Sequence, residues 1–458
     1  MKFNKLAIED KNELVFGNAP NPVLTPRGLN IGGGTVYPEL NFTLPSMTVS
    51  RETLKEVLKH YKQIANGALK RAYELHSDGV ILEFESLIEM TKTPDIGVEI
   101  VKAMNEICEE YYQKKGLKSE IRLTPNDLRE FERPPKQRTS ELIHPMMELF
   151  ERGAEAGGNL LSIETTGGKE ISDDALMMCD IKQFMFSQTV LGVRDMKMIW
   201  NKIVSIANKT GVIPGGDTAC GFGNTAMVLA EKQYIPRVFA AIARIITVVR
   251  TIVAIEEGAK GPDKDCGYEG PFLKAITGIP ISMEGKSAAC AHLSPVGNVA
   301  AACCDLWSNE SVQNIKLLAD MAPTVYMEQL IYDTRLMNQA TLNGKGAVLN
   351  YQQLLIDSDI FLDPQALILA PEHVISISHE IVKGKTYIEA ARLGSLKGLQ
   401  IIRSAYEDGL LKLDDKEIIY LDTLQYDIES IPNEEPQFLD MIMPTIDHSK
   451  LLLKEYGL

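Results

Sequence analysis

The sequence predicts an α/β fold, a (β/α)8 TIM barrel with an N-terminal arm and helical extension and with helical additions at the C-terminus. Three observations predict this fold. Short apolar runs alternate with amphipathic helical patterns, as expected for parallel strands joined by crossover helices. Most of these runs are continuously apolar, which is typical of strands covered on both faces. No cluster of glycines follows the first run, VILEFESLIEM (80–90), so a doubly wound dinucleotide-binding sheet is disfavoured.

The segment 1–75 is expected to pack on the barrel as an arm and a helix. Its first fifty residues are rich in glycine, proline and asparagine, which indicates irregular structure, but they are too apolar for a disordered tail. A helical pattern follows over roughly 50–77. Ser50 is the expected N-cap, because its hydroxyl can accept a hydrogen bond from an unpaired amide of the first turn.

The barrel is expected over residues 76–380. Its strand candidates are six short runs, at 79–86, 121–125, 159–166, 211–217, 280–285 and 324–329. Amphipathic helical patterns lie between them at 95–114, 139–156 and 193–209. The stretch FERPPKQRTS (131–140) is expected to be a loop that follows a strand. Residues 381–458 are expected to form a helical addition, in which 387–411 is the clearest helix.

Composition and charge limit the partners of this chain. Its 458 residues are 45% hydrophobic and 24% charged, which is typical of a globular protein with a large core. The formal net charge is −15, so nucleic acid is not expected as a partner, since phosphate contacts need clustered lysines and arginines. The acidic surface instead indicates a soluble protein.

No membrane association and no export are expected. The most apolar segment, 238–255, contains Arg244 and Arg250 and has fewer than about 18 uninterrupted apolar residues, so it is predicted to be a buried helix. The N-terminal stretch is polar and lacks the apolar region of a secretory signal. The chain has seven cysteines, an odd number that favours reduced thiols over a disulfide framework. These observations predict a cytoplasmic protein.

Three glycine-bearing loops carry the candidate functional residues. Glu164 lies in SIETTGG (162–168), Cys220 in GGDTACGFGN (215–224) and Cys266 in GPDKDCGYEGP (261–271). Loops that follow barrel strands meet at one rim, where active sites of this fold lie. One carboxylate and two thiolates at that rim would suit Zn²⁺. Other interpretations stay open: the cysteines can be incidental, Glu164 can cap a helix or pair with a cation, and glycine loops also bind phosphate.

Longer blocks of sequence carry a resemblance to a known family. They are NPVLTPRGLNIGGGTVYPELNF (21–42), GGNLLSIETTGGKEISDDAL (157–176), GGDTACGFGNTAMVLAEKQYIPRVFAAI (215–242), CGYEGPFLKAITGIPISMEGKSAACAHLSPVGN (266–298) and PTVYMEQLIYDTRLMNQA (323–340). Together they resemble the methanol:corrinoid methyltransferase family, the substrate-activating subunits of methanol-specific methyltransferase systems. Members are similar in fold to (β/α)8 barrels and bind zinc through one glutamate and two cysteines. Carried over to this sequence, the resemblance implies Glu164, Cys220 and Cys266 as zinc ligands.

The resemblance also implies a reaction and partners. Zinc would activate methanol, and the methyl group would pass to cobalt(I) of a corrinoid. The DxHxxG string of corrinoid-binding domains is absent from this sequence, so the corrinoid is expected on a separate protein. A homodimer at the core of a heteromeric complex is also implied. Asp217 and Glu284 are candidate proton donors to the departing oxygen.

Three other functions remain open from the sequence. The chain could act on another small methyl donor, such as a methoxylated compound. It could be a non-catalytic scaffold for the corrinoid protein, although all three ligand types are present. It could also be a metal-free barrel enzyme that binds phosphate through its glycine loops, although none of these matches the phosphate-binding GxxxxGK[ST] pattern.

Overall fold

A curved sheet of parallel strands forms the centre of the molecule. The structure is a computed structural model that describes residues 1–264, 267–285 and 294–458. Within these residues, seven strands pair in the order β7-β6-β5-β4-β3-β9-β8. Their bounds are β3 (Tyr37–Thr43), β4 (Val80–Glu85), β5 (Ser119–Thr124), β6 (Leu160–Ile163), β7 (Ile213–Asp217), β8 (Ser282–Glu284) and β9 (Leu306–Val312). Because all of them run parallel, their carboxyl ends share one edge.

A short segment closes this sheet into a ring. The amides of Lys260 and Gly261 each donate a hydrogen bond of 2.8 Å to a carbonyl of β7, one edge of the sheet. Asp263 forms a parallel bridge with Ile281, directly before β8 at the other edge. Residues 260–263 therefore occupy the eighth strand position, between β7 and β8. The prediction of a (β/α)8 barrel is confirmed.

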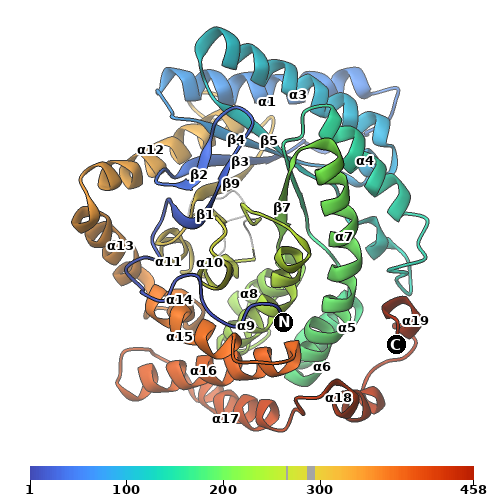
Figure 1. Ribbon diagram of the computed structural model, residues 1–458, viewed down its shortest axis with the longest axis vertical. Coiled ribbons are helices and arrows are strands. Elements are labelled where there is room, and N and C mark those ends of the chain that lie inside the picture. The colour runs from blue at the N-terminus through green and yellow to red at the C-terminus, as the bar shows by residue number, and fades with distance from the viewer. Residues whose placement is uncertain (265–266, 286–293) are drawn as a thin grey trace.

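Helices surround the ring, as Figure 1 shows. The helices that belong to the barrel run from the one after β3 to the one after β9, the last strand. They are α1 (Leu54–Glu74), α2 (Ile88–Lys92), α3 (Pro94–Lys115), α4 (Ile143–Glu155), α5 (Lys169–Met178), α6 (Ile181–Phe186), α7 (Val193–Thr210), α8 (Thr225–Glu231), α9 (Arg237–Glu257), α10 (Gly270–Thr277), α11 (Gly297–Ala301) and α12 (Ala322–Leu342). The C-terminal additions are α13 (Lys345–Asp359), α14 (Pro364–Leu369), α15 (Pro371–Ile381), α16 (Tyr387–Glu407), α17 (Asp415–Glu429), α18 (Glu435–Ile442) and α19 (Leu453–Tyr456). In Figure 1 the later additions, α15 to α18, lie along one side of the barrel.

A hairpin covers the amino ends of the strands. It consists of β1 (Asn18–Leu24) and β2 (Asn30–Gly33), which pair antiparallel and appear in blue in front of the ring in Figure 1. Its Leu29 and Ile31 are buried in one cluster with residues near the starts of four barrel strands, Tyr37, Ile81, Leu160 and Leu306. Arg27 of the connecting turn lies 3.1 Å from Glu120 of β5. The hairpin closes this end, so access to the barrel interior is from the carboxyl ends.

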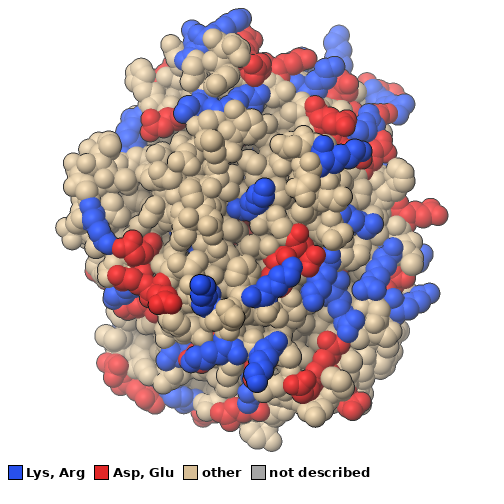
Figure 2. Space-filling model, in the orientation of Figure 1, with Lys and Arg blue, Asp and Glu red and all other residues tan. Residues whose placement is uncertain are grey.

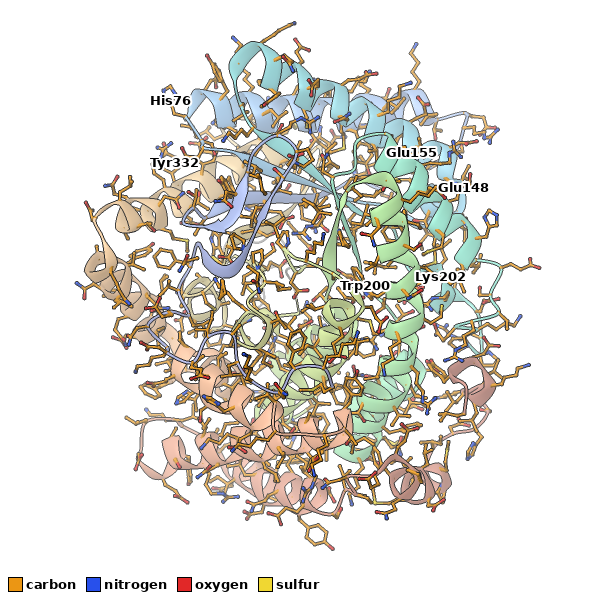
Figure 3. The ribbon with its side chains drawn as sticks, viewed as in Figure 1. His76, Glu148, Glu155, Trp200, Lys202 and Tyr332 are labelled. Carbon is orange, nitrogen blue, oxygen red and sulfur yellow. The ribbon has the colours of Figure 1, made fainter. Side chains whose placement is uncertain are left out.

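Most predicted elements are confirmed. The apolar runs before residue 290 form β4 to β8, and the helical patterns form α1, α3, α4, α7 and α16. The segment 238–255 lies in α9, which is long and apolar enough to cross a membrane, but 94% of its most apolar window is buried inside the protein. Figure 3 shows how such packing orients side chains on α7: Trp200 lies toward β7, and Lys202 lies on the outer side.

Three predictions about elements are wrong. Residues 324–329 are not a strand: they lie in α12, where buried Met327, Leu330 and Thr334 recur with a helical period. The arm is not irregular throughout, because it contains the barrel strand β3. The N-cap of α1 is Thr53, not Ser50, whose amide instead donates to the Thr53 hydroxyl at 2.9 Å. The division into 1–75, 76–380 and 381–458 stays a prediction.

Candidate functional site

Glu164 and Cys220 lie at the carboxyl ends of neighbouring strands. Glu164 directly follows β6, and Cys220 begins a π-helical turn (Cys220–Asn224) three residues after β7. The strands pair so that Ile163 is opposite Asp217. The Glu164 side chain is 31% exposed, and Cys220 is also partly exposed. Both side chains are therefore accessible at the rim where the sequence places them.

The third predicted ligand, Cys266, lies outside the described residues. The next residue, Gly267, is described and lies against the loop that carries Cys220. A Cβ at Gly267 would come within 2.3 Å of the Thr218 hydroxyl and 1.9 Å of Glu269 Oε2, so no larger side chain fits there. Both of these oxygens are buried and have no hydrogen-bond partner among the described residues. The two loops therefore pack closely against each other around Gly267.

Two buried arginines of α9 hold the loops in place. Arg250 donates to the carbonyls of Gly167 at 2.6 Å and Thr165 at 2.7 Å, in the loop after Glu164. The same guanidinium stacks 4.1 Å from the centre of the Phe222 ring, in the turn after Cys220. One side chain therefore contacts both ligand-bearing loops.

Arg244 has the matching role for the third loop. It lies on α9 before Arg250, and its guanidinium donates to the carbonyl of Gly267 at 2.7 Å and to the side chain of Gln365 at 2.9 Å. It also lies 5.3 Å from the centre of the Tyr268 ring. Burial lowers the pKa of both arginines from the usual value, because desolvation disfavours the charged form. Sequence reasoning used these charges only against a membrane span, although two arginines in an apolar helix are themselves a signal.

A lysine bridges three carboxylates at the rim. The Lys264 ammonium lies 3.1 Å from Glu83, 3.4 Å from Glu85 and 3.1 Å from Glu164. Lys264 itself is buried, with 1% of its side chain exposed. It orients the Glu164 carboxylate and compensates its charge. Sequence reasoning did not identify this residue, although it is the one lysine of the GPDKDCGYEGP loop.

The two candidate proton donors are both buried. Asp217 accepts hydrogen bonds from the Trp200 indole at 2.8 Å and from the amide and hydroxyl of Thr165 at 3.2 Å. Burial raises its pKa to about 7, against the smaller opposing effect of Arg250. Glu284 ends β8, and its carbonyl accepts from the Tyr268 hydroxyl at 3.4 Å. Asp217, the last residue of β7, thus holds Thr165, the residue after Glu164, by hydrogen bonds.

A hollow of about 300 Å³ opens at the carboxyl ends of β3, β4, β5 and β9. It is lined by Asn41, Phe42, Thr43, Glu85, Ser86, Leu87, Asn126, Glu310, Ser311 and Val312. Glu85 connects it to Glu164 through Lys264, which contacts both carboxylates. We call this space the mouth hollow. It can receive a small polar molecule at the same rim of the barrel as Glu164 and Cys220.

The donor chemistry fits zinc. A carboxylate oxygen and a thiol sulfur are both zinc ligands, and Glu164 and Cys220 present them on adjacent loops. In the part of the chain that the structure describes, no group of three or more histidine, cysteine, aspartate or glutamate side chains could hold a metal ion. The predicted set of three would need Cys266, which is not among those residues.

Comparisons with known proteins place the chain in one family. A family model described as methanol-cobalamin methyltransferase B subunit, MtaB, matches residues 1–457. A methanol–corrinoid protein co-methyltransferase of Methanosarcina barkeri (strain Fusaro / DSM 804) is 36% identical over 444 residues, 96% of this chain and 95% of that protein. The crystal structure of the methanol:cobalamin methyltransferase complex MtaBC from Methanosarcina barkeri contains a chain with a TM-score of 0.94 and 34% identity, over 100% of this chain and 99% of that one.

Proposed function

The chain belongs to the methanol-cobalamin methyltransferase B subunit family, and we propose that it transfers the methyl group of methanol to the cobalt of a corrinoid carried by a separate protein. The family match over residues 1–457 supports this function. The observation that carries it is the placement of Glu164 and Cys220 on adjacent strand ends, at the rim onto which the mouth hollow also opens.

We propose that Glu164, Cys220 and Cys266 hold one Zn²⁺. Zinc there would supply Lewis acidity, which lowers the cost of the negative charge that develops on the oxygen leaving the methyl group. Arg250 fixes the loops of Glu164 and Cys220 relative to each other. Lys264 fixes the direction of the Glu164 carboxylate. Such preorganisation matters because a metal site works only when its ligands are held in position.

The departing oxygen also needs a proton, and we propose Asp217 or Glu284 as its source. Asp217 supports this role through its pKa of about 7, which leaves a proton on part of the molecules at neutral pH. Its hydrogen bond to Thr165 places it one residue from Glu164. Glu284 supports the role through its position at the carboxyl end of β8.

The remaining partners are proposed from the family resemblance. The methyl acceptor would be a separate corrinoid protein that covers the carboxyl ends of the strands. The barrel subunit would form a homodimer at the core of that complex, in the cytoplasm. Sedimentation of the purified chain, alone and with a corrinoid protein, would test both associations: a chain that stays monomeric alone contradicts the homodimer.

Metal content and activity together test the proposed function. We expect about one zinc per chain, and methyl transfer from methanol to free cob(I)alamin. Cys220→Ala, Cys266→Ala and Glu164→Gln should lose zinc and activity together, since each removes a ligand. Cys179→Ala is the control, because Cys179 lies at the end of α5, and it should retain both.

Two results would contradict the proposal. Full zinc content in both ligand cysteine variants would show that the metal site is elsewhere. Faster transfer from methoxylated donors than from methanol would show a different substrate.

A further inference from the structure

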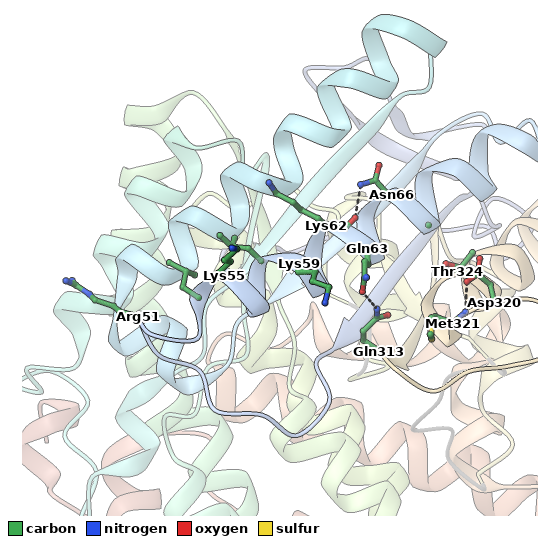
Figure 4. A pocket seen from close by; sticks show the side chains of 13 residues that line it. Arg51, Lys55, Lys59, Lys62, Gln63, Asn66, Gln313, Asp320, Met321 and Thr324 are labelled. Atoms are coloured by element: carbon green, nitrogen blue, oxygen red, sulfur yellow. Dashed lines mark hydrogen bonds between the residues drawn. The ribbon is translucent and has the colours of Figure 1, made fainter.

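A groove with basic walls runs along the first turns of α1, outside the barrel (Figure 4). Its volume is about 970 Å³, larger than that of the mouth hollow. The charged residues that line it are Arg51, Lys55, Lys59 and Lys62 of the α1 side and Asp320 of the connection to α12. Four positive charges and one negative charge thus gather in a chain whose net charge is −15. We call this feature the α1 groove.

Part of this positive charge has no partner. Arg51 pairs with Asp95 at 2.7 Å, and Lys59 pairs with Glu56 at 3.1 Å. Lys55 and Lys62 are exposed, and among residues 1–264, 267–285 and 294–458 neither has an ion-pair partner. They lie seven residues apart on one face of α1 and both line the groove. These two ammonium groups are available to an acidic ligand.

The α1 groove adjoins the mouth hollow. The helices that form it, α1 and α12, follow the carboxyl ends of β3 and β9. Val312 lines the mouth hollow and the next residue, Gln313, lines the groove. The amide of Gln313 donates to the carbonyl of Thr43 at 3.0 Å, which joins the two walls. A molecule that covers the mouth hollow therefore lies beside the groove.

An exposed apolar loop borders the groove. Residues 314–320, NIKLLAD, are all exposed and lie between β9 and α12. Leu318 is fully exposed, at 104% of the reference area, and Ile315 is 50% exposed. Leaving such side chains in water is unfavourable, and grouped apolar residues with polar neighbours are typical of protein interaction sites. A small anion would make no use of Leu318.

We propose that the α1 groove and the 314–320 loop form the docking surface for the corrinoid-carrying protein, which presents an acidic segment to Lys55 and Lys62 and an apolar pocket to Leu318. This inference rests on the proposed function, because that function requires a protein to bring cobalt to the mouth hollow. Charge complementarity selects an acidic partner. On the face of the molecule that Figure 2 shows, by contrast, lysines and arginines lie among acidic side chains.

Methyl transfer to two acceptors tests the docking surface. Free cob(I)alamin needs no docking, whereas a corrinoid protein that the wild type methylates does. For Lys55→Glu/Lys62→Glu and for Leu318→Ser, we expect the KM for the corrinoid protein to rise about tenfold or more, with unchanged transfer to free cob(I)alamin. Increasing salt should raise the KM of the wild type for the corrinoid protein more than that of the lysine variant, because salt screens the attraction between charges. Lys412→Glu/Lys416→Glu is the control, because it changes the charge equally on exposed residues next to and within α17.

The possible results separate the two proposals. If the wild type methylates neither acceptor, the proposed function fails, and the docking surface with it. If the wild type methylates both and the groove and loop variants keep the wild-type KM for the corrinoid protein, only the docking surface is wrong. If inorganic phosphate competes with the corrinoid protein and Leu318→Ser has no effect, the groove binds a free anion and the docking proposal is overturned.

Discussion

At the scale of single residues, Arg250 has the most demanding position in the molecule. It is fully buried, and burying a charge costs several kcal/mol unless hydrogen bonds compensate. Here the compensation comes from the carbonyls of Thr165 and Gly167 and from the face of Phe222. The planar guanidinium can satisfy several acceptors at once, which a lysine cannot do with the same geometry. The side chain therefore couples the two loops that carry Glu164 and Cys220.

Replacing this arginine should weaken metal binding beyond its effect on folding. Arg250→Met leaves buried carbonyls without donors, and we expect a loss of about 3–5 kcal/mol in stability. We also expect a zinc affinity at least about tenfold lower, measured by competition with a chelator, because the ligand loops lose their common anchor. Arg250→Lys should recover part of the stability and less of the affinity.

Lys274→Met is the matched control for Arg250→Met. Lys274 is equally buried, and its ammonium contacts Asp305 at 2.9 Å and two backbone carbonyls. Asp305 directly precedes β9, so this cluster lies at the amino ends of the strands, away from the ligand loops. The control should lose stability while its zinc affinity stays near that of the wild type. Equal losses of affinity in both variants would mean that Arg250 acts only through general stability.

The candidate ligands could be proposed from the sequence, but their supports could not. Glu164 directly follows an apolar run, and Cys220 lies three residues after the next strand among glycines, so a local pattern identifies them. Lys264 and Arg250 contact carboxylates and carbonyls that lie 83 to 179 positions away, and no local pattern encodes such pairs. The roles of Cys266 as a ligand and of Asp217 and Glu284 as proton donors stay predictions.

At the scale of elements, polarity decides which strands the sequence predicts. The runs that form β4 to β7 are mainly apolar or glycine-bearing and were predicted. β3 and β9 were not, because their sequences YPELNFT and LWSNESV contain polar residues that the barrel interior buries. Glu39 of β3 pairs with Arg122 of β5, and both are fully buried. A polar strand interior satisfied by distant partners resembles a loop when only local sequence is considered.

The closing segment 260–263 was also missed, and its glycine gives a test. Gly261 has φ +85°, and a Cβ there would lie 2.8 Å from the carbonyl oxygen of Pro280. Gly261→Ala therefore combines backbone strain with a clash at the junction that closes the barrel. We expect it to lower the free energy of unfolding by about 2–4 kcal/mol, measured by urea denaturation.

Gly116→Ala is the control for this substitution. Gly116 also has a positive φ, +69°, in the left-handed helical region at the end of α3, but a Cβ there would meet no atom within 4 Å. It should therefore cost only the backbone strain, about 1–2 kcal/mol. If the two variants lose equal stability, the contact with Pro280 is not what makes Gly261 necessary.

At the scale of the whole molecule, buried acids link stability to pH. Burial raises the pKa of Glu170 to about 7 and that of Asp363 to about 6. It raises the pKa of Asp217 to about 7 as well, and those of Asp263 and Glu269 also lie above their usual values. In each case the folded chain holds a proton that the unfolded chain has released at the same pH. Unfolding then releases protons, so rising pH favours the unfolded state.

The metal-free chain should therefore be less stable at about pH 8.5 than at about pH 5.5, because these two values bracket the folded-state pKa values of Glu170 and Asp363. The contribution of Glu170 is fully present below its unfolded pKa and is lost as pH rises through about 7. That of Asp363 is lost through about 6, and each is worth at most about 3 kcal/mol. His373 acts in the opposite direction, because burial lowers its pKa, but it is a single group.

Urea denaturation across this pH range, with neutral variants, tests the assignment. Glu170→Gln and Asp363→Asn should each flatten the fall in unfolding free energy, because they remove a titrating group and keep its hydrogen-bonding shape. Asn remains a good N-cap for α14, where the Asp363 carboxylate accepts from the Gln365 amide at 2.8 Å. The exposed Asp440→Asn should leave the slope as it is. A stability that rises with pH, or an unchanged slope in both buried variants, would mean that other groups set the pH dependence.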